Sequence, residues 1–203
     1  MKDFFCSNIL IEDIDLILSE LKNKFLSKFI NKNFGFNNID IKELTDCPII
    51  SKWISSNNLI LRAIAIINIP KQYKQNIHID WNEFTSNDKI STFNKSNIDH
   101  IDETITYALN FNLYNCENST TYMFCQHNKK ETLKFNSNKL PFYAFSPNDV
   151  SLKTSFILKN VILLNVGVPH QVVNETEDQR ISLSLRFNKI NLLKFNLSNT
   201  TFY

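Results

Sequence analysis

Residues 168–188 read VPHQVVNETEDQRISLSLRFN, and the second half of this stretch decides the fold that the sequence predicts. From Arg180 to Phe187, polar and apolar residues alternate strictly. Successive side chains of a β-strand point to opposite faces, so Arg180 and Arg186 share a polar face with two serines. The apolar face should pack against other elements, and the polar face should line an interior, as in a barrel. The chain has three arginines against nineteen lysines, so two arginines on one strand need a chemical reason.

The stretch before this strand, NVILLNVGVPHQVV at residues 160–173, predicts a partner strand with residues 174–178 as the hairpin loop. With a loop of that length, Val172 lies opposite Arg180, and His170 shares the polar face with Arg180. The alignment depends on the loop length, because a slip of one residue moves every side chain to the other face.

The composition is that of an ordinary globular domain. The chain has 203 residues, of which 43% are hydrophobic and 21% charged, with a net charge of +2. This length suffices for one well-covered core. The lysines are scattered, so charge gives no strong nucleic-acid signal. About one residue in seven is Asn and only two are Gly, which indicates A- and T-rich coding, as in some viruses and streamlined microbes.

Neither a membrane partner nor a cysteine metal site is expected. No apolar run approaches the roughly 20 residues of a membrane span, and acidic residues interrupt the apolar opening, unlike in a signal peptide. The four cysteines form no CxxC pair, which predicts reduced thiols. We therefore expect a cytoplasmic protein, and the coding bias extends this to a virus-encoded protein acting in the host cytoplasm.

The chain divides into a helical front and a strand-rich body. Apolar residues recur with a helical period over residues 12–30, and a second helix should begin near Thr45 or Asp46 as N-cap, with Pro48 in its first turn. Short β-branched or aromatic segments follow at residues 61–69, 107–115, 120–125, 160–168 and 180–187. This order predicts a mostly β sandwich or barrel with helices on one outer face. As one structural domain, it would comprise a helical segment (1–60), the barrel (61–188) and a tail (189–203).

A second motif supplies partners for His170. In NIHIDW, residues 76–81, His78 and Asp80 are two positions apart, so both side chains project to one side of a strand. Two histidines and one carboxylate from two strands form the triad that binds Fe(II) and leaves coordination positions open on one side. Those positions suit the two donor atoms of a 2-oxo acid and then dioxygen. The far carboxylate of this cosubstrate needs a planar two-donor cation, which Arg180 supplies and lysine only partly matches; Ser182 lies beside it.

His-x-Asp, a distant His, and an Arg-x-Ser that begins ten residues after that His resemble the Fe(II)- and 2-oxoglutarate-dependent dioxygenases. The resemblance covers roughly residues 60–188 and implies a double-stranded β-helix, a jelly-roll or cupin-like barrel. The stretch at residues 78–124 is also similar to small oxygenase-like proteins of phages and other viruses.

The resemblance implies a role for seven residues. The metal ligands and catalytic centre are His78, Asp80 and His170, and the residues expected to bind 2-oxoglutarate are Arg180, Ser182, Asn110 and Tyr122. The implied reaction hydroxylates or demethylates an unidentified substrate with dioxygen, while 2-oxoglutarate loses CO2 to give succinate. A small molecule, a protein side chain and a nucleobase all fit as the substrate.

Several alternatives stay open. Arg180 can pair instead with Asp178 or Glu177 in the expected hairpin loop. His100 and Asp102 repeat the His-x-Asp spacing without a strand pattern around them. The whole barrel can also be a non-catalytic or non-oxidative metal-binding module for binding or assembly, because fold alone does not fix function.

The polar segment at residues 82–104 directly follows Asp80, so we expect it to form a lid over the site, with a plain surface loop as the alternative. Trp81 is a candidate for the substrate pocket, and a core position is the alternative.

Overall fold

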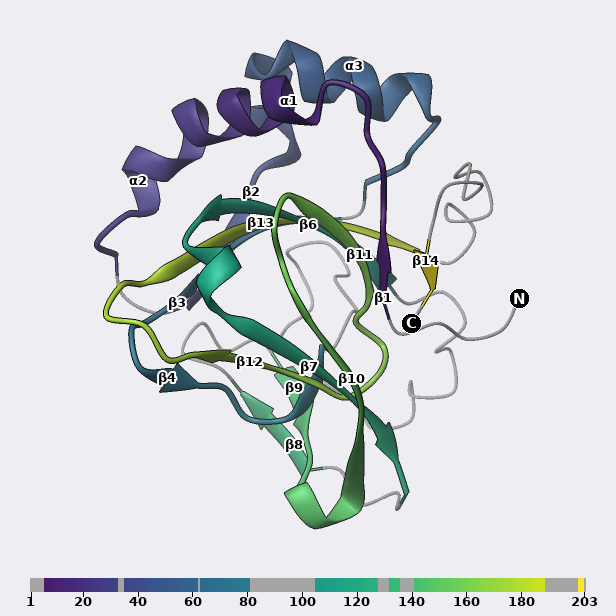
Figure 1. The fold of residues 1–203 in the computed structure, drawn as a ribbon. Coiled ribbons are helices and arrows are strands. Elements are labelled where there is room, and N and C mark those ends of the chain that lie inside the picture. Colours follow the sequence, from purple (N-terminus) through teal and green to yellow (C-terminus); the bar gives the residue numbers. More distant parts are fainter. Residues whose placement is uncertain are drawn as a thin grey trace.

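The structure is a computed structural model, and it describes residues 6–32, 35–61, 63–80, 105–127, 132–135, 141–188 and 201–202. Two antiparallel β-sheets face each other, and helices cover the outer side of one of them (Figure 1). Trp81, the expected lid at residues 82–104, and the His100 motif within it lie outside the described residues.

The first sheet, sheet A, has the strand order β14-β1-β11-β6-β13-β3-β2. Its strands are β1 (Cys6–Asn8), β2 (Gly35–Ile39), β3 (Ala63–Ile69), β6 (Ile105–Tyr114), β11 (Val161–Asn165), β13 (Arg180–Asn188) and β14 (Thr201–Phe202). The segments in which the sequence predicted strands at 61–69, 107–115 and 180–187 are all members of this sheet. Two strands from the expected helical front and one from the expected tail also belong to it.

The second sheet, sheet B, has the order β10-β7-β12-β5-β9-β8, and β4 pairs with β12 beside this path. Its strands are β4 (Tyr73–Lys74), β5 (His78–Asp80), β7 (Thr120–Gln126), β8 (Thr132–Phe135), β9 (Pro141–Ala144), β10 (Val150–Ile157) and β12 (His170–Asn174). Two facing antiparallel sheets with this winding form a double-stranded β-helix, which confirms the predicted fold class.

The helical layer consists of α1 (Ile14–Leu21), a π-helical turn (Lys22–Leu26), α2 (Ser27–Phe29), a 3-10 helix (Ile41–Asp46) and α3 (Pro48–Ser56). Further 3-10 turns lie at Cys116–Asn118 and Pro147–Asp149. The apolar face of β13 packs against this layer in one buried cluster, in which Leu183 and Leu185 meet Ile17, Phe25 and Ile50. The prediction of helices on one outer face is therefore confirmed. None of the described helices is long and apolar enough to cross a membrane.

The expected N-caps of α3 are wrong. The capping position is held by Cys47, and the side chain of Glu20 in α1 accepts hydrogen bonds from the N–H groups of residues 49–50. Thr45 donates instead to a backbone carbonyl in its own 3-10 helix, and Asp46 pairs with a lysine. A carboxylate near a helix N-terminus satisfies its free amides and its dipole. A tertiary contact thus replaces the local cap.

The predicted hairpin between residues 160–173 and Arg180 is also wrong. Residues 160–173 form two strands, β11 in sheet A and β12 in sheet B, separated by a turn that contains Gly167 and Pro169. The side chain of Asn165 accepts from the Gly167 N–H at this turn, and Pro169 has no N–H for a strand ladder. Because β13 pairs with β3 and β6, residues 175–179 carry the chain from one sheet to the other. His170 and Arg180 thus stand on strands of facing sheets.

Candidate metal centre and cosubstrate site

Three side chains that the sequence singled out meet between the sheets. His78 and Asp80 lie on β5, and His170 on β12 is in direct register with His78. The Nε2 atoms of His78 and His170 lie 3.3 and 3.9 Å from Oδ1 of Asp80, and the two imidazole centroids are 4.5 Å apart. One potential ligand atom from each residue lies within 4.8 Å of the others. This spacing is that of a cluster able to surround one metal ion.

Both imidazoles are held by the backbone in the orientation that a metal ligand needs. Nδ1 of His78 lies 2.8 Å from the carbonyl oxygen of Asn76, and Nδ1 of His170 lies 2.9 Å from that of Val168. A carbonyl only accepts hydrogen bonds, so each Nδ1 carries the proton and donates it. Each Nε2 therefore offers its lone pair to the cluster, the arrangement found around metal-ligating histidines.

The charges of the cluster also suit a divalent cation. Burial, and then the neighbouring His78, lower the pKa of His170 to about 4, so its imidazole is neutral at pH 7. Burial by itself raises the pKa of Asp80, but the Arg186 guanidinium and the two histidines hold that pKa well below its usual value of 3.8. The site thus combines a carboxylate anion with a neutral imidazole at its buried end.

Arg186 is the functional residue that sequence reasoning missed. Its Nη1 lies 2.5 Å from Oδ2 of Asp80, and its side chain is 2% exposed. The guanidinium carbon also lies 5.2 Å from the ring centroid of Phe36 on β2. One carboxylate oxygen of Asp80 is thereby held by Arg186, while the other faces the imidazoles. The strand alternation placed Arg186 on the inner face, and the scarcity of arginine was the signal that it had a role.

Arg180 has a different environment. It is 2% exposed, and its Nη1 donates a hydrogen bond to Oγ of Ser182 at 3.3 Å. Among the residues that the structure describes, no carboxylate lies within ion-pair distance of Arg180, and Nε has no hydrogen-bond partner. Neither Glu177 nor Asp178 forms the alternative ion pair with Arg180 among the described residues, and Glu177 accepts a hydrogen bond from Gln72. A buried guanidinium without a counter-charge costs several kcal/mol, so this position is suited to an anion.

Further polar atoms without protein partners continue along the same inner face. Ser184 on β13 is in register with Asn110 on β6, and Ser182 with Asn112. Within the described part of the chain, Oγ of Ser184 and the Oδ1 atoms of both asparagines are buried without a hydrogen bond. Buried polar atoms are normally paired, so an unpaired row points to a polar ligand or to ordered water. The Arg180 guanidinium and the serine hydroxyls of this face can donate to a carboxylate-bearing cosubstrate, whereas the two amide oxygens only accept and fit ordered water.

Tyr122 does not join this row. It is in register with Gln171 and Ser155, whereas the next residue, Met123, is in register with His170. Adjacent side chains of a strand point to opposite faces, so Tyr122 points away from the metal cluster. The register of β7, whose phase the sequence did not fix, therefore gives no support to the expected cosubstrate contact of Tyr122.

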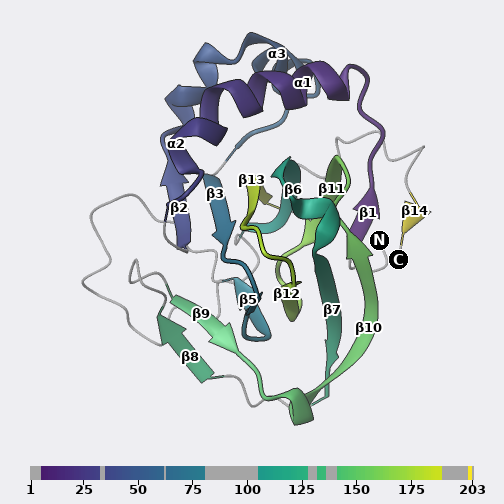
Figure 2. The ribbon, with the colours of Figure 1, turned by 60° about the vertical axis from the view of Figure 1, so that its left-hand side comes forward.

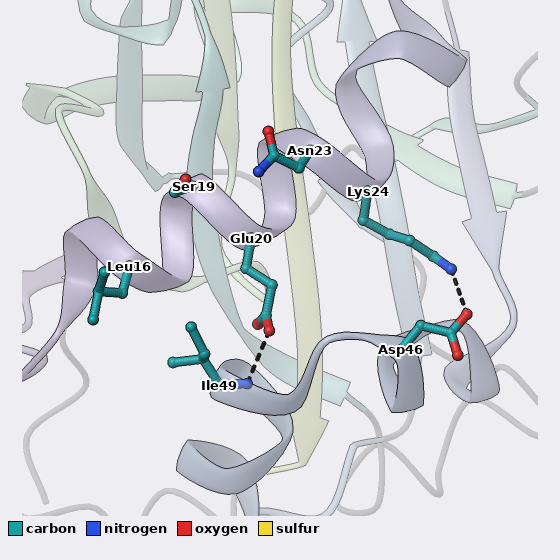
Figure 3. A pocket seen from close by; sticks show the side chains of 7 residues that line it. All are labelled: Leu16, Ser19, Glu20, Asn23, Lys24, Asp46 and Ile49. Carbon is teal, nitrogen blue, oxygen red and sulfur yellow. Dashed lines mark hydrogen bonds and ion pairs between the residues drawn. The ribbon is translucent and has the colours of Figure 1, made fainter.

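A depression of about 500 Å³ lies elsewhere, between α1 and the segment that leads into α3 (Figure 3). Its charged side chains are occupied by structural contacts. Lys24 pairs with Asp46 at 2.5 Å, and Glu20 accepts from the N–H of Ile49. These contacts join the helices, and the metal cluster lies on the other side of sheet A.

The fold and the site together define a class of protein: a double-stranded β-helix with a His-Asp-His cluster between its sheets. The resemblance to the Fe(II)- and 2-oxoglutarate-dependent dioxygenases is confirmed in both respects. No protein-family model matches the sequence, and no curated protein matches it.

Several solved structures are similar to this chain. HygX from Streptomyces hygroscopicus, crystallised with nickel and 2-oxoglutarate, is 12% identical over 90% of this chain and 82% of its own, with a TM-score of 0.50. A prolyl-4-hydroxylase from Pseudomonas putida is 13% identical over 91% and 92%, with a TM-score of 0.46. The viral collagen prolyl hydroxylase of Paramecium bursaria Chlorella virus-1 is 8% identical over 91% and 95%, with a TM-score of 0.41. The similarity to HygX supports the assignment of the fold and nothing further.

Proposed function

We propose that this protein is an Fe(II)- and 2-oxoglutarate-dependent dioxygenase that hydroxylates or demethylates its substrate. The observation that carries the proposal is the cluster of His78, Asp80 and His170, with both Nε2 atoms aimed at one carboxylate oxygen. Two imidazole nitrogens and one carboxylate oxygen on one side of an Fe(II) ion leave its other positions open. These three residues would hold the ion, while Arg186 holds the second oxygen of Asp80.

The cosubstrate site is the buried polar row on β13 and β6. Arg180 binds the distal carboxylate of 2-oxoglutarate through its planar pair of donors, and Ser182 assists. Asn110 contacts the cosubstrate from the neighbouring strand. The support for the role of Arg180 is that its guanidinium is buried, with no acidic partner among the described residues and no hydrogen-bond partner for Nε. Asn110 is buried on the same face and would donate through its amide nitrogen, because 2-oxoglutarate offers only acceptors.

The reaction that this site supports is oxidation of a C–H bond. When bound, Fe(II) supplies the redox chemistry by which C–H, dioxygen and 2-oxoglutarate yield C–OH, succinate and CO2. The chain itself binds and orients the reactants and excludes water. An apolar cluster lines the interior beside the polar row, where Met123 is in register with His170 and Ile162 with Asn110. A dry interior strengthens the electrostatic contacts and limits side reactions.

The test is conversion of 2-oxoglutarate to succinate by the purified protein with Fe(II) and air, measured without a primary substrate. We expect slow turnover that requires Fe(II) and is lost in His170→Ala and Asp80→Ala. The control is His127→Ala, which alters an exposed histidine just after β7 and should leave turnover unchanged. Turnover that persists without the triad would contradict the proposal. Metal binding at the triad without any turnover would favour the non-catalytic barrel instead.

A further inference from the structure

Among the described residues, the His-Asp-His cluster and its Arg186 partner differ in their exposure to solvent. The side chains of His170 and Arg186 are 6% and 2% exposed, whereas those of His78 and Asp80 are 15% and 19% exposed. The two more exposed residues stand on β5, whose neighbour β9 leads to the edge of sheet B. Within the described part of the chain, the more exposed part of the cluster, which we call the opening, thus lies on β5 next to β9, and the part on β12 and β13 is more buried.

One phenylalanine from each sheet stands at this opening. Phe142 on β9 is in register with Asp80, so it shares the inner face, and its ring centroid lies 5.8 Å from that of His78. Phe36 on β2 is in register with Ile67, which is in register with Ser182, so Phe36 also faces inward. Both phenylalanines are partly exposed. Strands β2 and β9 lie on the same side of the molecule, one in each sheet (Figure 2).

A continuous set of contacts joins the two rings through the cluster. Phe36 lies against the Arg186 guanidinium, Arg186 pairs with Asp80, Asp80 lies beside His78, and His78 contacts Phe142. The Asp80–Arg186 pair is thus bordered by a ring of sheet A at Arg186 and by a ring of sheet B at His78. Aromatic rings supply apolar contact area with defined geometry.

The charges that the described residues bring to the opening disfavour a cationic group. Aromatic rings attract cations, but Phe36 already has the Arg186 guanidinium against it. The inner-face residue of β8 in register with Phe142 is Lys134, which is exposed and also positive. The carboxylate of Asp80 is paired with Arg186 and faces the metal position. An uncharged group meets no such repulsion.

We infer that the primary substrate reaches the metal centre between β2 and β9 and presents an uncharged, apolar group that contacts Phe36 and Phe142. This inference rests on the proposed function, since it takes the cluster to be the metal centre. It assigns a substrate class: the C–H bond that is oxidised belongs to a neutral apolar moiety, with no ammonium group next to it.

The test uses the protein loaded with Mn(II) and 2-oxoglutarate, because Mn(II) is paramagnetic and broadens the NMR signals of protons near it. Two probes of similar size differ in charge: indole is uncharged and planar, and tetramethylammonium is an apolar cation. We expect the wild-type protein to broaden indole at least about fivefold more strongly at equal concentration, because the cation meets Arg186 and Lys134. Phe142→Ala and Phe36→Ala should each weaken the indole effect about three- to tenfold.

Matched controls change neighbours on the same strands. Tyr143→Ala and Asn37→Ala alter residues on the opposite faces of β9 and β2 and should leave the broadening unchanged. Phe142→Leu keeps most of the apolar volume, so it should reduce the broadening of indole less than Phe142→Ala does. Equal broadening of the two probes by the Mn(II)-loaded wild type, or no effect of either alanine variant, would overturn the inference alone. A wild-type protein that does not bind Mn(II) would overturn the proposed function, and this inference with it.

Discussion

Replacing Arg186 by Met should strongly destabilise the metal-free protein and have much less effect on the metal-bound protein. The substitution keeps the length of the side chain but removes the guanidinium that holds Oδ2 of Asp80 at 2.5 Å. Breaking one partner of a buried ion pair costs about 3–5 kcal/mol, because the remaining charge stays uncompensated. The Asp80 side chain is 19% exposed, so water screens part of its charge and we expect the lower end, about 3 kcal/mol.

A divalent cation at the cluster supplies the missing positive charge. A metal ion that binds only the folded state stabilises it, and the gain grows with the logarithm of the metal concentration divided by its Kd. Mn(II) should therefore restore most of the stability that Arg186→Met loses. The assay is urea unfolding of the parent, Arg186→Met, Asp80→Asn and the double variant, with and without Mn(II). In the metal-free series, the double variant should show a coupling energy of about 2 kcal/mol or more between the two residues.

The matched control is Arg180→Met on the same strand. Arg180 is equally buried but has no acidic partner among the described residues, so its removal should be neutral or stabilising in the metal-free, cosubstrate-free protein. A loss of less than about 1 kcal/mol in Arg186→Met, or an equal loss in Arg180→Met, would refute this role of Arg186.

Three further predictions follow from the site. Arg180→Lys should raise the concentration of 2-oxoglutarate needed for half-maximal turnover on the order of tenfold, because lysine lacks the second donor. Ser182→Ala should raise it less. Unchanged affinity for 2-oxoglutarate in Arg180→Lys would contradict the role of Arg180 as the carboxylate anchor. The pKa of His170 is about 4 in the folded protein against an ordinary value of 6.5. Between pH 4 and pH 6.5, unfolding therefore takes up a proton at this imidazole. Up to roughly 3 kcal/mol of stability should be lost as the pH falls from about 6.5 to 4. Urea unfolding at several pH values should show this loss in the parent and much less of it in His170→Asn, and equal losses would argue against it. A short Gly/Ser bridge in place of residues 86–100, which lie outside the described residues, should preserve metal and 2-oxoglutarate binding but separate 2-oxoglutarate turnover from product formation; undiminished product yield would exclude a lid.

The local patterns in the sequence predicted what depends on local geometry. The two-residue spacing of His78 and Asp80 fixed their common side, and the alternation from Arg180 to Phe187 fixed the inner and outer faces of β13. The helical period over residues 12–30 likewise located the outer layer, although the chain there forms α1, a π-helical turn and α2.

The pairing of strands could not be predicted from the sequence, because it depends on contacts between segments far apart in the chain. Residues 160–173 read as one strand, yet the turn at Gly167 divides them between the two sheets. The strands at 132–135, 141–144 and 150–157 were missed altogether. Arg186 and Asp80 are 106 positions apart, so their pairing became visible only once the facing sheets were placed. The phase of Tyr122 depended in the same way on pairing with β12.

The most direct measurement is anomalous X-ray diffraction from crystals grown without oxygen in the presence of Mn(II) and 2-oxoglutarate. We predict one metal peak about 2.1 Å from Nε2 of His78, Nε2 of His170 and Oδ1 of Asp80. Two oxygens of 2-oxoglutarate should lie at the same ion, and its far carboxylate should be paired with Arg180. A metal peak away from these three atoms, or a cosubstrate whose far carboxylate lies away from Arg180, would contradict the account.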